Sequence, residues 1–177
     1  MVSAADLKII MPHSTRIAEM LDPLNAAMEE YGIVTPPREA MFLAQVAHES
    51  SEMNFLREIW GPTAAQSRYE GNTRLGNTQP GDGKRFRGRG LIQVTGRANY
   101  LLVGGYLGVD LIAHPELLEQ PVYAARSAGL YWQRHKLNNL ADLGLIVPVT
   151  KAINGGLNGI DSRIKYWQTA KKVLGVS

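Results

Sequence analysis

The segment from residue 36 to residue 49, PPREAMFLAQVAHE, is apolar on nearly every face of the helix that it predicts. A helix with apolar residues all around its axis is typical of a buried position. Two prolines open the segment, and the first turn is where a helix tolerates proline. We therefore predict a central helix around which the rest of the chain packs, with His48 and Glu49 at its end.

Apolar residues at helical spacing predict further helices before and after this segment. The first covers residues 17–28, with Ser14 or Thr15 as its cap and Gly32 as its stop. The chain returns to helix in its last third, at residues 123–131, 148–153 and, with Asp161 as the cap, 161–174.

Residues 60–90 interrupt the helical pattern. Their glycines and prolines exclude a long helix, so we predict an extended loop region with a functional role or high mobility. The segment LIQVT at 91–95 is a short strand candidate. The predicted fold is therefore mainly α-helical with little β structure. The length of 177 residues fits one domain, and we find no repeat or interdomain linker.

Composition narrows the class of protein further. The chain has no cysteine, which excludes disulfides and thiolate chemistry. The apolar run at 7–11 contains Lys8 and ends at Pro12, too short for a signal peptide, and no stretch approaches the ~18 apolar residues of a membrane span. We expect synthesis in a cytoplasm and no membrane insertion. The net charge of +3 suits an anionic partner such as cell wall or nucleic acid.

Glu49 is the leading candidate for an acid–base group. A carboxyl group at the edge of an apolar core loses hydration, which favours its protonated form, as a general acid requires. The local pattern also fits an exposed glutamate at a frayed helix end. Glu58 lies nine positions later, on the opposite face if one straight helix continued, so the two can meet only if polar residues 50–54 form a turn. The rivals for a second carboxylate are Glu52 and Glu70.

The segment KRFRGRGLIQVTGRANY, residues 84–100, combines five cations with three glycines. Glycine allows a ligand to approach the backbone closely. The neutral polar side chains of this segment suit sugar hydroxyls and N-acetyl groups. A solvated basic loop with no binding role would have the same sequence pattern. A single RGRG is poor evidence for RNA binding, so we expect no nucleic-acid partner. The neutral candidates are Gln93, Thr95, Asn99 and Tyr100.

A third polar segment, AINGGLNGIDSR, spans residues 152–163. Asn154 precedes two glycines, a pattern that predicts either a turn presenting its amide to a cleft or a simple helix C-cap. His48 and Glu49 begin like a zinc motif, but Glu52 stands where the second histidine is required. We therefore expect no metal.

Taken together, AHES at 47–50, FRGRGLIQVTGRANY at 86–100 and AINGG at 152–156 resemble glycoside hydrolase family 19. REIWGPTAAQSRYEG and LGNTQPGDGKRF resemble its bacteriophage endolysin branch more than plant chitinases. The resemblance covers residues 36 to the C-terminus. It implies a lysozyme-like helical domain with a substrate cleft between two lobes. It also implies cofactor-free, inverting hydrolysis of a β-1,4 bond beside an N-acetyl sugar.

The resemblance also implies roles for particular residues. Glu49 matches the general acid, Glu58 of REIW the carboxylate that activates water, and Thr95 a hydroxyl that helps to hold this water. Chitinases of the family place the second glutamate farther from the first, an interval that Glu70 fits better. The positions that match substrate contacts are Gln93, Tyr100 and Asn154, and Arg163 matches a basic residue that contacts substrate or orients the carboxylates.

We therefore expect a single catalytic domain, residues 1–177, without a separate cell-wall-binding domain. It would cut peptidoglycan as a monomeric, muramidase-type endolysin. It would be made in a host bacterial cytoplasm and reach the wall after release by another factor. A chitinase is the nearest alternative, which Asn158 disfavours because chitinases tend to carry glutamate there. A non-catalytic wall-binding protein is the other alternative, disfavoured because Glu49, Glu58 and Thr95 occur together.

Overall fold

The computed structural model describes residues 1–176 of the chain and is mainly helical. The elements in chain order are α1 (Ala4–Ile10), α2 (Ile17–Glu30), α3 (Pro36–Glu49), α4 (Ala64–Ser67), η1 (Thr73–Leu75), α5 (Asp82–Arg85), α6 (Arg97–Leu107), η2 (Pro115–Glu119), α7 (Pro121–Arg134), α8 (Leu137–Asp142), α9 (Ile146–Asn154) and α10 (Ile160–Val173).

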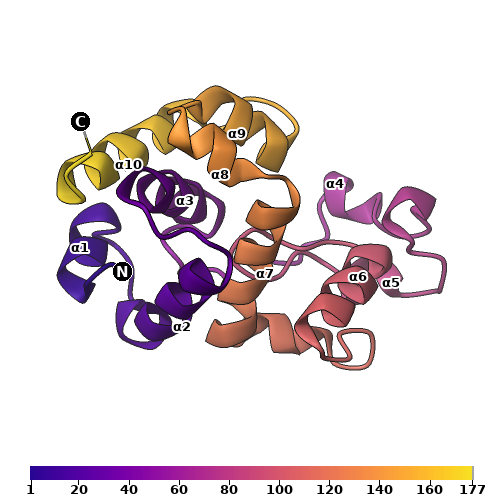
Figure 1. Cartoon of the computed structure of the whole chain (residues 1–177). Coiled ribbons are helices and arrows are strands. Elements are labelled where there is room, and N and C mark those ends of the chain that lie inside the picture. The colour runs from indigo at the N-terminus through magenta and orange to yellow at the C-terminus, as the bar shows by residue number, and fades with distance from the viewer. Residues whose placement is uncertain (177) are drawn as a thin grey trace.

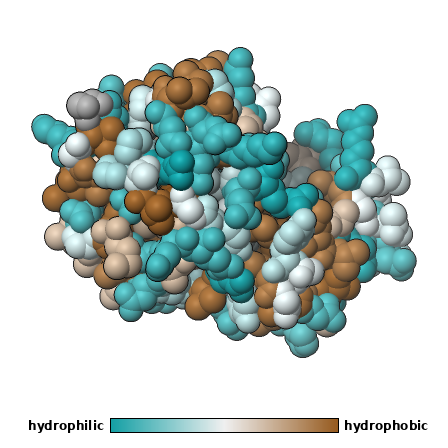
Figure 2. Space-filling model, viewed as in Figure 1, coloured by the Kyte–Doolittle hydropathy of each residue, from teal (hydrophilic) through white to brown (hydrophobic). Residues whose placement is uncertain are grey.

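The helices form two groups with α7 between them (Figure 1). The larger lobe contains α1, α2, α3, α8, α9 and α10. The smaller lobe contains α4, α5 and α6 and the irregular segments that join them. Figure 2 shows the surface hollowed between the α9 side of the larger lobe and the α4 side of the smaller one. The predicted mainly α, two-lobed fold is confirmed.

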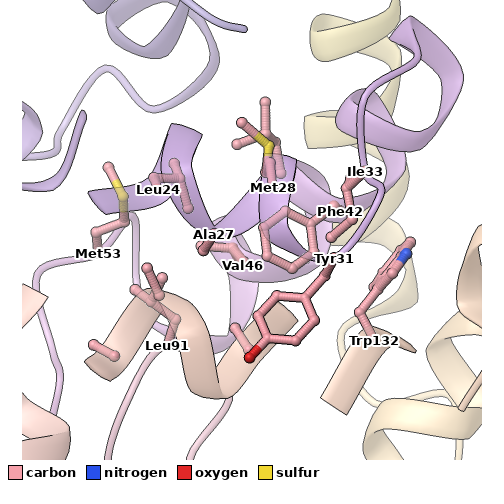
Figure 3. Packing of buried hydrophobic residues seen from close by; sticks show 14 of the residues in the cluster. Leu24, Ala27, Met28, Tyr31, Ile33, Phe42, Val46, Met53, Leu91 and Trp132 are labelled. Carbon is pink, nitrogen blue, oxygen red and sulfur yellow. The ribbon is translucent and has the colours of Figure 1, made fainter. Parts of the chain in front are cut away.

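Helix α3 is the centre of the larger lobe, as its apolar sequence predicts. Every residue from Glu39 to Ala47 is buried. Phe42 of α3 meets Trp132 of α7 edge-to-face, with ring centroids 5.3 Å apart, and Figure 3 shows both rings in the buried cluster. Aromatic pairs in this geometry contribute about 0.5–1.5 kcal/mol beyond the area that they bury. The packing fixes the axis of α3, and therefore the position of Glu49 at its C-terminus.

Two details of the predicted secondary structure are wrong. The segment 91–95 forms no strand. Instead the loop makes isolated antiparallel bridges that pair Arg57 with Arg89 and Arg89 with Val94, because Gln93 adopts a positive φ of 57° and turns the chain. The predicted helix caps also differ. Arg16 precedes α2 and Gly159 precedes α10, neither with a side-chain cap, and the Thr15 amide donates to Asn54 instead.

Within residues 1–176, none of the helices combines the length and apolar character that crossing a bilayer would require.

Candidate active site

Glu49 ends α3 and makes an ion pair with Arg163 of α10. Arg163 Nη2 donates to Glu49 Oε1, while Nη1 donates to Gln45 Oε1 at 2.5 Å and Nε to the Asn158 carbonyl at 3.3 Å. The Arg163 side chain is fully buried, whereas the Glu49 side chain retains 17% of its exposure. One oxygen of Glu49 is therefore held by a buried cation at the end of the most buried helix.

This geometry changes the expected role of Arg163 in two ways. A fully buried side chain cannot contact a polysaccharide, so the prediction of direct substrate binding by Arg163 is wrong. Its ion pair is with Glu49 alone, of the two carboxylates that we expected it to orient. The position of Arg163 fits an orienting role toward Glu49.

His48 lies behind Glu49 and packs against the start of α10. Its Nδ1 is 3.1 Å from Ser162 Oγ. A Cβ built on Gly159 would lie 2.1 Å from the His48 ring, so only glycine leaves room for it there. Burial, followed by the charge of Arg163, lowers the pKa of His48 below its usual value. The imidazole is therefore neutral at pH 7 and adds no second cation beside Glu49.

The predicted turn between Glu49 and Glu58 is present and has an unusual backbone. Ser51, Glu52 and Met53 have φ values of 49°, 61° and 66°, although none is glycine. Left-handed conformations of such residues cost of order 1–3 kcal/mol each and persist only where surrounding contacts hold them. Those contacts are strong here, because Met53 is fully buried and both carboxylate oxygens of Glu52 are bonded.

Glu58 follows this turn and is held by hydrogen-bond donors on both oxygens. Oε1 accepts from Gln66 Nε2 at 3.0 Å and from the Tyr69 hydroxyl at 3.4 Å, and Oε2 accepts from the Gly88 amide at 3.1 Å. Burial, and then the charge of Glu58, raises the pKa of Tyr69, which keeps this hydroxyl a donor. Neutral donors around both oxygens suit an ionised carboxylate, which can only accept.

The smaller lobe brings Gln93 and Thr95 to the same place as Glu58. A Cβ built on Gly88 would lie 2.7 Å from Gln93 Oε1 and 3.3 Å from Thr95 Oγ1, so both side chains touch the residue that bonds Glu58. Thr95 Oγ1 donates to the Gln93 carbonyl at 2.9 Å. Its lone pairs stay available to accept a hydrogen bond from a water molecule. Glu58, Gln93 and Thr95 therefore form one cluster around Gly88.

Gln93 and Thr95 line a cavity of about 320 Å³ between the lobes, together with Tyr131 of α7 and Ile153 of α9. Burial, followed by the charge of Glu49, raises the pKa of Tyr131. The Tyr131 hydroxyl donates to the Ala152 carbonyl at 2.6 Å. Asn154, one residue after Ile153, is exposed at the end of α9, which is compatible with the substrate contact that we predict for it.

Tyr100 is not placed to contact substrate, contrary to the expectation from the family resemblance. It is fully buried, and its hydroxyl donates to the Arg87 carbonyl at 2.6 Å and accepts from Arg89 Nη1 at 2.9 Å. Burial raises its pKa to about 12. Tyr100 therefore holds the backbone next to Gly88 in place through its hydrogen bond to the Arg87 carbonyl.

The rival carboxylates have structural partners. Glu70 Oε1 and Oε2 accept from the amides of Gly81 and Gly83 at 2.7 and 2.9 Å. Glu52 is buried, and its oxygens accept from the His13 amide at 2.5 Å and the Tyr166 hydroxyl at 2.8 Å. Both residues hold loops together, which leaves Glu58 as the better candidate for the second carboxylate.

Glu58 also lines a larger groove of about 650 Å³, which we call the basic groove. Four cations line it, Arg16, Arg57, Lys84 and Arg87, and Trp60 adds an aromatic surface. The basic segment was predicted from the sequence, but the contributions of Arg16 and Arg57 were not, because these residues reach the groove from distant parts of the chain. The carboxylates that line the basic groove are Glu58 and Glu119.

No group of three histidine, aspartate or glutamate side chains in residues 1–176 is arranged to hold a metal ion.

The two-lobed helical fold is shared with solved chitinases. Chitinase C from Streptomyces griseus superposes with a TM-score of 0.77 at 25% identity, covering 99% of this chain and 77% of that one. A bacterial family 19 chitinase superposes with a TM-score of 0.76 at 24% identity, covering 99% and 96%, and shows the likeness of fold. The class of protein is a glycoside hydrolase.

The particular family follows from sequence. A protein of Haemophilus influenzae described as a glycosyl hydrolase family 19 domain-containing protein is 33% identical over 196 residues, covering 95% of this chain and 94% of the relative. The chain belongs to glycoside hydrolase family 19.

Plant relatives of the chain are described as chitinases. Endochitinase CHI of Arabidopsis thaliana is 32% identical over 167 residues, and chitinase 5 of Oryza sativa is 30% identical over 147. The matches cover 88% and 77% of this chain but only 60% and 48% of those two proteins. The scan against protein-family models gave no match.

Proposed function

We propose that this protein hydrolyses the β-1,4 bond between N-acetylmuramic acid and N-acetylglucosamine in bacterial peptidoglycan, as an endolysin does. The observation that carries this proposal is the basic groove beside Glu58, where four cations face two carboxylates. Peptidoglycan strands carry carboxylates on their peptide branches, and on the lactyl group where the peptide has been removed, whereas chitin is neutral. A cleft lined by one sign of charge concentrates a polymer of the opposite sign. We further propose that it reaches the wall after release by another factor.

In the proposed mechanism Glu49 protonates the leaving oxygen and Glu58 activates a water molecule on the opposite face of the sugar. Inverting enzymes hold their two carboxyl groups about 6.5–9.5 Å apart to admit that water. Thr95 Oγ1, which touches the same glycine as Glu58, would accept one hydrogen bond from the water. The donors around Glu58 support its role as the ionised partner, and the exposed part of Glu49 leaves one oxygen free to reach substrate.

Chitin hydrolysis is the second candidate. The relatives named as endochitinases favour it, and the two polymers share the β-1,4 linkage and the N-acetyl group. The charge of the basic groove separates the candidates, because it offers nothing specific to a neutral polymer.

Incubation of the purified protein with peptidoglycan and with chitin tests the proposal. We expect new reducing ends on peptidoglycan, identified as muramitol, the alditol of muramic acid, after borohydride reduction and acid hydrolysis. Glu49→Gln protein serves as the control for contaminating activity. Reduced glucosamine from chitin, with no new muramic end from the wall, would replace the proposal with a chitinase.

A further inference from the structure

Arg87 lines the basic groove, and within residues 1–176 it forms no ion pair with a carboxylate, which is also true of Lys84. Glu119 is engaged by Arg89 at 2.7 Å and by Arg57 at 3.3 Å. Arg16 pairs with Glu19. Glu58 is occupied by neutral donors. Both carboxylates that line the groove therefore have other partners.

The hydrogen bonds of Arg87 are also incomplete. Its Nε is buried without an acceptor among residues 1–176, and Nη1 makes only a long 3.4 Å bond to the Lys84 carbonyl. A buried donor that leaves water without finding an acceptor costs free energy. Burial, together with the charges of Arg89 and Arg57, lowers the pKa of Arg87 from its usual value, as expected of a cation among cations. The guanidinium of Arg87 is therefore able to bind an anion from a ligand.

The backbone at Arg87 is fixed relative to the candidate base. Its carbonyl accepts from the buried Tyr100 hydroxyl at 2.6 Å. The next residue, Gly88, donates to Glu58 Oε2 at 3.1 Å and accepts from the Glu58 amide at 2.8 Å. An anion bound by Arg87 would therefore lie next to Glu58, on the part of the substrate close to the bond that is cut.

We propose that Arg87 binds a carboxylate carried on the lactyl branch of a muramic acid residue beside the cleaved bond. This inference rests on the proposed function and adds a specific receptor to it. A guanidinium matches a carboxylate with two parallel N–H···O bonds, which a lysine cannot do. The carboxylate has two sources with the same chemistry. It is the lactyl group itself where the peptide has been removed, or the first acidic residue of the peptide where it remains.

Calorimetric binding to Glu49→Gln protein, which leaves the ligand uncut, tests this receptor. The ligands are peptide-free glycan strands, the same strands with methyl-esterified carboxylates, peptide-bearing strands, and chitin oligosaccharides of equal length. We expect strands with free carboxylates to bind at least about tenfold more tightly than esterified strands, the usual scale for a charge-assisted hydrogen bond. The charged strand that binds more tightly identifies the source of the carboxylate.

Adding Arg87→Gln should remove this preference and leave binding of chitin oligosaccharides within about twofold. Arg74→Gln is the matched control, because Arg74 is exposed on η1 and lines neither cavity. Equal binding of esterified and free strands by Glu49→Gln protein would overturn the proposal. Equal weakening of charged and neutral ligands by Arg87→Gln would make Arg87 structural and would also overturn it. Wall hydrolysis by the wild-type protein is scored separately, so a failure of the proposed function can be told from a failure of this site.

Discussion

Among single residues, Arg163 has the most direct influence on Glu49. It is fully buried and bonded to Glu49, to Gln45 and to the Asn158 carbonyl. Removing one member of a buried ion pair leaves the other charge uncompensated, at a cost of about 3–5 kcal/mol. The same change frees the Glu49 carboxylate to adopt other rotamers.

We predict that Arg163→Ala lowers the free energy of unfolding by about 3–5 kcal/mol and lowers kcat at least about tenfold in the protein that stays folded. Arg163→Lys keeps the charge but loses the planar fork, so it should recover stability better than it recovers kcat. Denaturant unfolding and steady-state kinetics check both. An Arg163→Ala protein with wild-type kcat would show that Glu49 needs no orienting cation.

A second prediction at this scale concerns the water-activating cluster. Glu58→Gln should lower kcat by at least ~10²-fold, the lower scale for acid–base catalysis, while it still binds substrate. Thr95→Ala should lose less, because a water molecule can replace the hydroxyl. Glu70→Gln is the control and should keep most activity, since its partners are backbone amides. An active Glu58→Gln protein beside an inactive Glu70→Gln protein would move the base to Glu70.

The candidate site was only partly predictable from sequence at this scale. The family resemblance pointed to Glu58, Gln93 and Thr95, which the fold does bring together. A resemblance gives no information on burial, and so Tyr100 was expected at the surface of the cleft. Which carboxylate Arg163 pairs with was not predictable, because the pairing depends on how α10 packs on α3.

At the scale of elements, the left-handed turn after α3 sets the path between the two glutamates. Glu52 bonds it to the His13 amide and to the Tyr166 hydroxyl. Glu52→Ala should lower the free energy of unfolding by about 1–3 kcal/mol, since two part-buried donors lose their buried acceptor, and should also reduce kcat. Glu29→Ala, at an exposed glutamate of α2, should stay within about 0.5 kcal/mol. Thermal unfolding and kinetics measure both, and a Glu52→Ala protein with unchanged kcat would mean that the turn does not position the glutamates.

The helices were predictable where apolar residues recur at helical spacing. The central helix was recognised because nearly all its faces are apolar, a pattern that is typical of a buried helix. The turn at Ser51 to Met53 was not predictable in detail, because its backbone conformation disfavours the residues that adopt it. The strand expected at 91–95 failed for a similar reason at Gln93. In both segments tertiary contacts override local preference.

For the whole molecule, ion pairs tie distant elements together and give stability a pH dependence. Arg97 of α6 donates to both oxygens of the buried Asp82 of α5 at 2.7 and 2.6 Å. These hydrogen bonds lower the pKa of Asp82 below its usual value. A carboxylate with a lowered folded-state pKa stabilises the protein above its unfolded pKa and loses that contribution as pH falls toward the folded value. Asp142 forms a more exposed pair of the same kind with Arg38.

We therefore predict that Asp82→Asn lowers the free energy of unfolding by about 1–3 kcal/mol at pH 7. The difference from the wild type should shrink as pH falls below about 4. Asp142→Asn, the matched control, should cost less, because solvent screens the more exposed pair. Urea unfolding between pH 7 and pH 3 measures all three proteins. A deficit of Asp82→Asn that stays constant down to pH 3 would assign its effect to packing.

The central claim is that Glu49 and Glu58 act from opposite faces of one sugar in peptidoglycan. Proton NMR of the fresh reducing end, recorded before mutarotation, tests it most directly. From a β-linked strand we predict the α-anomer of N-acetylmuramic acid as the first product, because water activated by Glu58 attacks opposite the leaving oxygen. A β-anomer as the first product would mean retention of configuration and would contradict the assignment of Glu58 as the water-activating base.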